Sequence, residues 1–393
     1  MHKISLAAVG ICLFTLAGFS QTPIDSSKYG NRKLKLEEIN FVSSYYHQDG
    51  DNSAVTGGIG TERLTDFATT IDVRLSKYDR KGRKRTVIGE VGLDVYTSAS
   101  SDKIDPATVS SASSGDQRIY PSLGYSITNE KTGSTVSIAG SISTEYDYFS
   151  KGLNIGWSKL SKNKNREFSV KGQVFLDTWT VILPIELRGS AGPRGSKPRN
   201  SYNASFTISQ VITRRLQLLL LADVAYQEGQ LATLYHRTYF TDGSHKFENL
   251  PDQRWKLPVG VRLNYFLGDE FILRTYYRYY ADTWGLQSHT AELEAAMKVT
   301  PFFSVSPFYR YYTQQGVDYF KPYEGHALSE TYYTSDYDLS ALSSHLAGIG
   351  LRYAPPGGVF NIHTLNALEF RYGHYRRSTK LTSDIFTLLL KFK

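Results

Sequence analysis

The residues with the clearest chemical potential lie between Thr97 and Gln117, where the sequence reads TSASSDKIDPATVSSASSGDQ. The phrase Ser-Ala-Ser-Ser occurs there twice, at 98–101 and at 111–114. Ser and Asp side chains bond their own backbone two residues on, so this composition by itself predicts compact turns. The same hydroxyl and carboxylate groups could also hold water, a cation or a polar solute. The candidate binding residues are Ser98, Ser100, Ser101, Asp102, Asp105, Ser113, Ser114 and Asp116.

Catalytic motifs are not evident elsewhere in the sequence. The GGIG stretch at 57–60 lacks the strand–helix context of a nucleotide-binding loop. Ser343, Ser344 and His345 suggest a hydrolase, but neighbours on one strand point to opposite faces, whereas a catalytic Ser–His pair must lie within hydrogen-bond reach. We therefore predict that the chain is not an enzyme, with no catalytic residue and no cofactor.

Metal-binding and nucleic-acid-binding signals are also weak. The histidines occur singly, without the spacing of metal ligands. The stretches DGDN at 49–52 and DYD at 336–338 could hold Ca²⁺, but such pairs are more often plain turns. The net charge of +8 is modest for 393 residues, and no dense basic stripe is present. We predict no metal site and no nucleic-acid partner.

Charged residues recur at alternate positions of several long stretches. In EFILRTYYRYY, which starts at Glu270, the charged residues fall on one parity and apolar and aromatic residues fill the other. TAELEAAMKV, from Thr290, and FSVSPFYRYYTQ, from Phe303, alternate in the same way. A strict two-residue period predicts strands that have one apolar and one polar face.

The length of these strands indicates their class. They run for about 10–13 residues, close to the 9–11 that a tilted strand needs to cross a bilayer, whereas ordinary strands have about 5–6. The 29 Tyr and 20 Phe suit a membrane interface. A soluble β-sandwich would need shorter strands and Greek-key connections. We therefore predict an all-β fold: a transmembrane antiparallel up-and-down β-barrel.

The connections between the predicted strands alternate in length. Every second one is tight, and the others include the long segments 98–116, 183–198, 229–254 and 316–343. This alternation is typical of short periplasmic turns and long extracellular loops. We count about sixteen strands, or fourteen if the close connection after Asp147 is not an outer loop. They begin near Lys35, Arg63, Lys84, Gln117, Ser134, Gly152, Arg166, Arg199, Leu216, Trp255, Glu270, Gln287, Phe303, Ser344, Phe360 and Leu381.

The predicted hairpins bring opposite charges together inside the barrel. With turns centred on Trp284 and Pro301, Arg274 faces Glu294 and the next pair along is Glu292 with Arg310; such opposed side chains lie about 5 Å apart at Cβ. This ladder could select solutes by charge, or it could only stiffen the wall by pairing. The lumen charges are Arg274, Arg278, Glu292, Glu294, Arg310, Arg118 and Asp94.

The first residues resemble an export signal. A positive residue precedes the apolar run 4–18, which is too short for a spanning helix. We expect a signal peptide at 1–20, a periplasmic leader at 21–34 and a single barrel domain at 35–393; one N-terminal anchor helix is the alternative. The only cysteine, Cys12, lies in the expected signal peptide, so the mature chain would have no disulfide.

The stretch LDVYTSASSDKID, followed by SSASSGDQRIYPSLGYS, resembles the hallmark region of a Bacteroidota outer-membrane β-barrel family of unknown function, domain of unknown function 3570. The resemblance is specific over about residues 93–126 and implies a large exported barrel without an established activity.

The function expected from the residues is a channel or transporter for small polar solutes or ions in the outer membrane, because about 16–18 strands leave an aqueous lumen. Its expected partners are the lipid bilayer, the barrel assembly machinery and a small polar solute. A non-conducting scaffold or docking barrel for a surface or periplasmic complex is the main alternative. A membrane-embedded lipid hydrolase is a weaker one.

Overall fold

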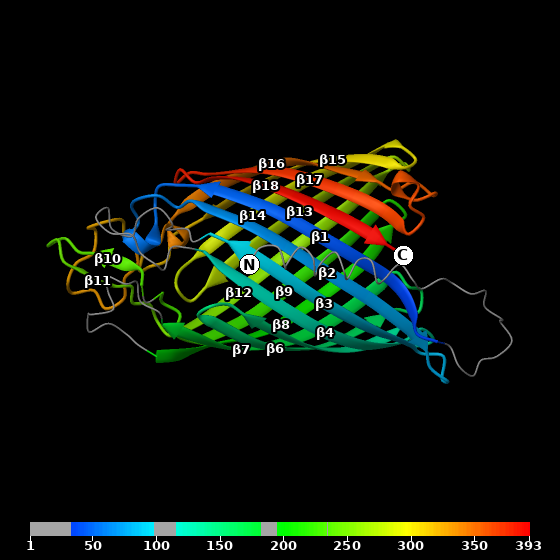
Figure 1. The fold of residues 1–393 in the computed structure, drawn as a ribbon, viewed down its shortest axis with the longest axis horizontal. Helices are drawn as coiled ribbons and strands as arrows, with labels where there is room; N and C mark the ends of the chain where they lie inside the picture. Colours follow the sequence, from blue (N-terminus) through cyan, green and yellow to red (C-terminus); the bar gives the residue numbers. More distant parts are fainter. Residues whose placement is uncertain (1–32, 98–114, 182–194, 234) are drawn as a thin grey trace, which may run out of the picture.

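A computed structural model describes residues 33–97, 115–181, 195–233 and 235–393. Sixteen strands in this part of the chain form one closed antiparallel barrel, in which the strands follow one another in chain order and the last pairs with the first (Figure 1). The barrel strands are β1 (Lys35–Asp49), β2 (Leu64–Tyr78), β3 (Lys84–Tyr96), β4 (Asp116–Asn129), β5 (Ser134–Thr144), β6 (Tyr148–Leu160), β7 (Arg166–Val181), β8 (Gly195–Thr213), β9 (Leu216–Gly229), β12 (Gln253–Leu267), β13 (Phe271–Asp282), β14 (Gln287–Thr300), β15 (Phe303–Gln314), β16 (Leu342–Tyr353), β17 (Leu365–Arg377) and β18 (Thr382–Phe392).

The smaller elements lie in the connections. Two short strands, β10 (Arg237–Tyr239) and β11 (His245–Phe247), form a separate antiparallel sheet. The described connections also contain the 3₁₀ turns η2 (Ala54–Thr56), η5 (Tyr337–Leu339) and η6 (Val359–Asn361). Among the described residues no helix has the length and apolar character needed to cross a membrane.

The predicted count of sixteen strands is confirmed, and the alternative of fourteen is wrong. The close connection between β5 and β6 is a true outer loop, closed by the Glu145 amide, which donates to the Tyr148 carbonyl over 2.8 Å. Three predicted starts are wrong by four or five residues. β17 begins at Leu365, five residues after the predicted Phe360, because Phe360 and Asn361 have positive φ and belong to a turn. The predicted starts Gly152 and Arg199 are each four residues late, since β6 begins at Tyr148 and β8 at Gly195. The expected signal peptide and nearly all of the leader lie outside the described residues.

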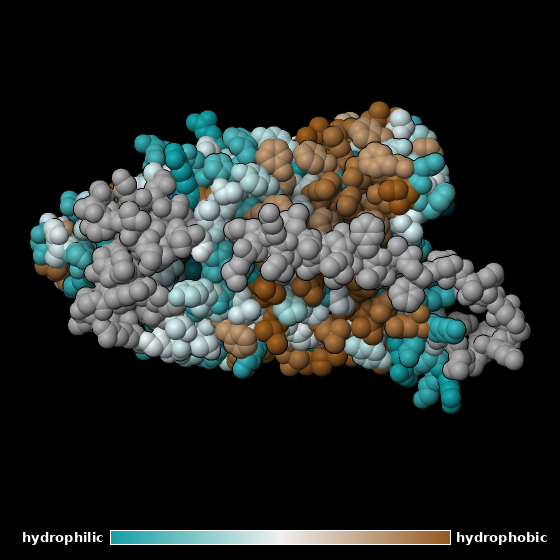
Figure 2. Space-filling view, in the orientation of Figure 1, coloured by the Kyte–Doolittle hydropathy of each residue, from teal (hydrophilic) through white to brown (hydrophobic). Residues whose placement is uncertain are grey.

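The outer face of the barrel carries an apolar belt. Large hydrophobic side chains that are exposed there include Val91, Leu123, Ile155 and Val259. Figure 2 shows hydrophobic residues gathered over the middle of the barrel and toward the end that holds the C-terminus, while the opposite end is hydrophilic. Lipid offers backbone groups no hydrogen bonds, so a closed barrel with such a belt is the architecture of an outer-membrane protein.

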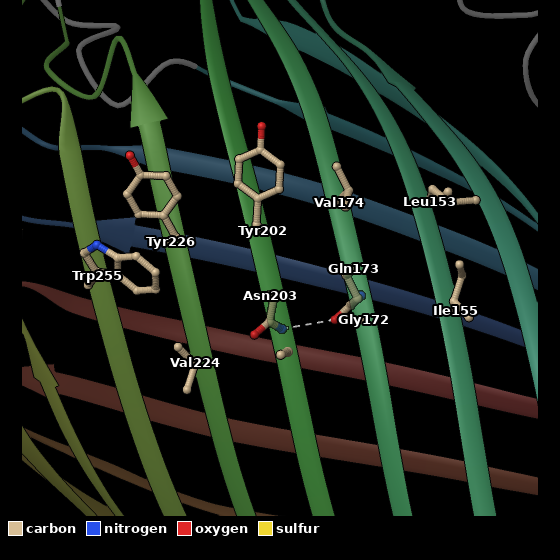
Figure 3. A pocket seen from close by; sticks show the side chains of 11 residues that line it. Leu153, Ile155, Gly172, Gln173, Val174, Tyr202, Asn203, Val224, Tyr226 and Trp255 are labelled. Carbon is tan, nitrogen blue, oxygen red and sulfur yellow. Dashed lines mark hydrogen bonds between the residues drawn. The ribbon is translucent and has the colours of Figure 1, made fainter.

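The belt is hollowed where small residues replace large ones. A groove of about 440 Å³ crosses β6 to β9 and β12 (Figure 3), and the small residues Gly172 and Ala204 are part of its lining. Tyr202, Tyr226 and Trp255 stand in a row along it, with ring centroids 6.2 and 4.7 Å apart. The row suits the boundary between lipid chains and head groups, because these side chains combine an apolar body with a polar tip.

The outer loops at the end opposite the C-terminus pack into a folded cap (Figure 1). We define the cap as residues 50–63, 230–252 and 315–341, with Leu234 excluded. Bridges join Phe240 to His326 and Asn249 to Tyr333, so two loops about 85 residues apart in sequence share backbone contacts. An apolar core lies beneath them, made of Leu231, Ala232, Leu250, Trp284, Leu286 and Val317.

Candidate functional site

The charge ladder predicted for the lumen wall is present in the register of three strands. Arg274 on β13 lies directly opposite Glu294 on β14, and the two side chains form an ion pair. Glu292 lies opposite Arg310 on β15, and the Arg310 Nε donates to the Glu292 carboxylate over 2.7 Å. The expected pairing is confirmed, since the tight turns fix the hairpin register. Whether these charges select solutes stays a prediction.

A second arginine reaches the same carboxylate. Arg371, on β17, donates from Nη2 to Glu294 Oε2 over 2.9 Å, although β15 and β16 lie between their strands. The side chain of Glu294 is almost fully buried under the two guanidinium groups, each of which stays partly exposed. One buried carboxylate therefore holds two arginine side chains against the curved wall, because charge-assisted hydrogen bonds are stronger than neutral ones.

Next to this network lies a polar cavity of about 240 Å³. Three guanidinium groups and two carboxylates line it, so positive charge is in excess. Arg262 is the uncompensated member: its guanidinium lies 5.1 Å from the ring centroid of Tyr276 and has no ion-pair partner among the described residues. The cavity can thus receive a small anion or a polar solute with acceptor groups. Its lining is Arg262, Asn264, Arg274, Thr275, Tyr276, Glu292, Glu294 and Arg371.

The predicted lumen residues Asp94 and Arg118 lie on the far part of the wall, on β3 and β4. They face each other in register, with 3.9 Å between Arg118 Nη1 and Asp94 Oδ2. Arg118 also approaches Glu145 at 3.5 Å, and the hydroxyl of Tyr120 donates to Asp94 over 3.0 Å. Arg278, by contrast, lies opposite Thr290, and its Nε has no hydrogen-bond partner in the described part of the chain.

The Ser-Ala-Ser-Ser loop falls almost entirely outside the described residues, because these resume at Gly115. Ser98, Ser100, Ser101, Asp102, Asp105, Ser113 and Ser114 therefore stay candidate binding residues only. Asp116, at the start of β4, is described, and it lies with Glu145 and Asp147 so that one oxygen of each falls within 4.8 Å of the others. Burial raises the pKa of Asp147, and neighbouring Asp116 adds to the shift.

Two other patterns in the sequence take ordinary structural roles. Ser344 is buried on one face of β16, and the Nδ1 of His345 on the other face lies 2.6 Å from the hydroxyl of Tyr309. Asp336 accepts a hydrogen bond from the Asp338 amide over 2.9 Å, so the DYD stretch is a turn, one of the two structures expected for it. Ser344 and His345 lie on opposite faces of β16 and so do not form a catalytic Ser–His pair with each other.

Sequence reasoning missed three side chains that the cap brings together: His236, Glu248 and Asp336. In the sequence, Asp336 belongs to a stretch typical of turns, and His236 is an isolated histidine. No spacing rule could have joined them, because the third ligand atom comes from a loop almost 90 residues further along the chain.

Comparison with known proteins gives one family. The model described as "Protein of unknown function (DUF3570)" matches residues 102–381. No curated protein matches the chain.

Three solved structures have a similar arrangement of strands. They are the Pseudomonas aeruginosa OpdQ (10% identity, TM-score 0.44, 91% of this chain and 97% of that chain covered), a BenF-like porin from Pseudomonas fluorescens Pf-5 (8%, 0.44, 90% and 98%) and Pseudomonas aeruginosa OpdK with vanillate (7%, 0.42, 90% and 97%). The barrel of this chain is defined by its own strand pairings.

Proposed function

This chain belongs to the DUF3570 family of proteins of unknown function, and we propose that it is an outer-membrane channel for small polar solutes that prefers anions. One observation carries the proposal: a closed barrel of sixteen strands encloses charged side chains. Barrels of about 16–18 strands leave an aqueous lumen, whereas smaller ones are filled by side chains.

The preference for anions follows from the excess of guanidinium groups around the 240 Å³ cavity. Arg274 and Arg371 share the single carboxylate of Glu294, and Glu292 is paired with Arg310, whereas Arg262 forms no ion pair among the described residues. An anion that enters the lumen would gain a charge-assisted contact with Arg262 at little cost, because this guanidinium already stands without a carboxylate.

Planar-bilayer recordings of the purified full chain test the proposal. We expect steady conductance steps. Under a KCl gradient, the reversal potential should be shifted from zero toward the equilibrium potential of chloride. Arg262→Gln should lower the chloride preference, and Arg80→Gln, an exposed residue of the tight β2–β3 turn, serves as the matched control. A channel that prefers cations contradicts the proposed anion preference. An unchanged reversal potential in Arg262→Gln contradicts the assignment of that preference to Arg262.

A second candidate is a docking barrel, which the folded cap favours. Loops with their own apolar core and a two-stranded sheet present a defined surface, as recognition of a partner requires. If the protein shows no conductance while circular dichroism and heat-modifiable gel migration indicate an intact barrel, docking becomes the better account.

A further inference from the structure

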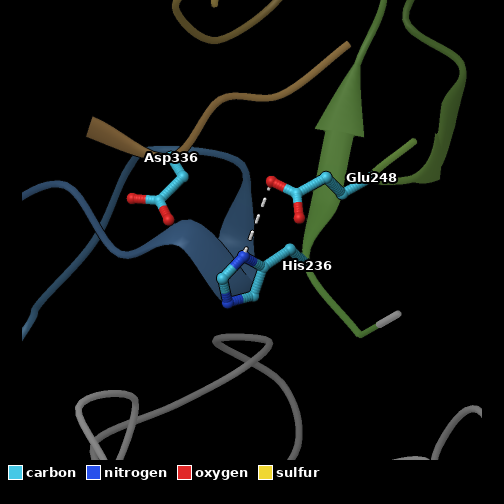
Figure 4. A group of neighbouring side chains, drawn as sticks. All are labelled: His236, Glu248 and Asp336. Atoms are coloured by element: carbon cyan, nitrogen blue, oxygen red, sulfur yellow. Dashed lines mark ion pairs between the residues drawn. The ribbon is translucent and has the colours of Figure 1, made fainter. Parts of the chain in front are cut away.

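The cap brings an imidazole and two carboxylates together away from the lumen charges. His236 and Glu248 flank the β10–β11 hairpin, and Asp336 comes from the loop that precedes β16 (Figure 4). One ligand atom from each of the three lies within 4.8 Å of the other two. These atoms come from two separate outer loops, so anything that bound all three would join the loops.

Each of the two carboxylates is held in place by the surrounding backbone. Glu248 accepts a hydrogen bond from the Thr233 amide over 2.6 Å and another from the Thr334 hydroxyl. The same hydroxyl accepts from the Asp336 amide over 3.0 Å. Thr334 therefore fixes both acids relative to each other, which is the role that outer partners play around metal ligands.

The backbone of His236 is held in place, whereas its ring nitrogen Nδ1 is not. Its carbonyl accepts from the Glu248 amide over 2.9 Å, which fixes its place across the hairpin. Its Nδ1 is buried and has no hydrogen-bond partner among the described residues. The nearest oxygen of Glu248 is 3.9 Å away, beyond hydrogen-bond range. A buried ring nitrogen without a partner costs free energy, so it points to a missing group.

Two acids face this nitrogen, and a protonated His236 would form only the long 3.9 Å ion pair with Glu248 that Figure 4 marks. Glu248 is almost fully buried, with 3% of its side chain exposed. Asp338, two residues after Asp336, is paired with Arg377, which also approaches Glu62. A cation between the three side chains would neutralise the two acids and satisfy the imidazole at once.

From this geometry we propose that His236, Glu248 and Asp336 bind a divalent ion of the zinc type, which ties the two outer loops of the cap together. Imidazole nitrogen with carboxylate oxygen suits zinc, while calcium and magnesium prefer oxygen alone. Zinc bonds of about 2.0–2.2 Å require the ligand atoms to move closer by roughly an ångström, which side-chain rotation supplies. Three protein ligands leave a fourth position for water.

Zinc titration of the full chain in detergent tests the proposal. After treatment with a chelator, isothermal titration at pH 7.5 should give one Zn²⁺ per chain, and excess Ca²⁺ should not compete. Asp336→Asn and His236→Ala should each weaken binding at least about tenfold, since even outer partners of a metal are worth 10–100-fold. His363→Ala removes an exposed histidine at the other end of the barrel and should leave binding unchanged.

A second readout follows the loops themselves. Zn²⁺ should slow hydrogen exchange in 235–248 and in 331–338 of the native chain, and it should have no such effect in Asp336→Asn. Glu248→Gln keeps the shape of the side chain, so it can replace Asp336→Asn or His236→Ala in this test if either of them disturbs the cap. Heat-modifiable gel migration shows whether the barrel of each variant is intact. Absence of zinc binding to the native chain, or native affinity in the variants, overturns the site. So does a His236 that titrates as a free imidazolium in the presence of zinc. Because conductance enters neither readout, failure here leaves the proposed channel untouched.

Discussion

Arg371 on β17 donates a hydrogen bond of 2.9 Å to Glu294 on β14, across the two strands that separate them. Neighbouring strands of a barrel pair through their backbones, so a side-chain bond over this span must cross a chord of the lumen. Glu294 also forms an ion pair with Arg274 on the neighbouring strand, so one carboxylate is shared by two arginines of the barrel wall.

Replacing Glu294 with Gln should raise the preference of the channel for anions. Arg274 and Arg371 would lose their shared counter-charge, and both are open to the lumen. We expect the permeability ratio of chloride to potassium to rise severalfold in reversal-potential measurements. Glu270→Gln, in the exposed β12–β13 turn, is the control. An unchanged ratio would mean that the ladder only stiffens the wall.

Replacing Trp284 with Ala should loosen the cap and spare the barrel. Trp284 is 3% exposed, its Nε1 donates to the Gln253 carbonyl over 3.0 Å, and Arg254 stacks over its ring. Loss of a buried Trp typically costs about 3–5 kcal/mol. Limited proteolysis should cut within 230–252 and 315–341 at an increased rate.

The matched control for this substitution is Trp157→Ala, because Trp157 is an exposed residue of the apolar belt. It should leave cleavage of the cap as in the native chain. Equal sensitivity of the two variants would show that the apolar core does not hold the cap together.

Acid should weaken the cap through Glu330. Burial alone would raise the pKa of this carboxyl, but hydrogen bonds from Lys321, the Ala327 amide and His326 lower it to about 2. A carboxyl with a depressed pKa stabilises the fold above its ordinary pKa of 4.5, and this contribution is lost as pH falls from about 4.5 to 2. Hydrogen exchange in 321–334 should therefore accelerate over that interval, after correction for intrinsic rates.

In Glu330→Gln the acceleration should shrink, because the glutamine has no proton to gain in this range. Protection at neutral pH should fall toward the acid value of the native chain. If the native chain and the variant responded to acid alike, the stabilising role of Glu330 would be refuted.

Gly58→Ala should disturb the cap more than an equivalent change elsewhere. Gly58 has a φ of +85°, and a Cβ there would come within 2.6 Å of the Ser335 carbonyl oxygen. Gly82, in the β2–β3 turn, has a φ of +70° and nothing within 4 Å of the added carbon. Both substitutions carry the backbone cost of the left-handed region, about 1–2 kcal/mol, but only Gly58→Ala adds a clash.

Protease sensitivity of the cap separates the two glycine variants. Gly58→Ala should expose 330–338 to cleavage, whereas Gly82→Ala should cleave like the native chain. Equal resistance of both would mean that the 50–63 loop does not need its close approach to Ser335.

The barrel was predictable from the sequence, and the cap was not. A two-residue period is a local signal, and tight turns fix the register, so the amino-acid pattern alone places Arg274 opposite Glu294. The bond between Glu294 and Arg371 depends on the curvature of the closed sheet, which no single hairpin records. The contact of Phe240 with His326 joins irregular loops without a period, so no pattern pointed to it.

The pairing of β1 with β18 has a consequence for biogenesis. β1 must wait for β18, more than 300 residues further along the chain, before one of its edges finds a partner. A chain released early would thus expose two unmatched strand edges, a template for aggregation. Pairing of β1 with β18 removes both edges at once, so closure should be all or none and degradation of shortened chains should be stringent.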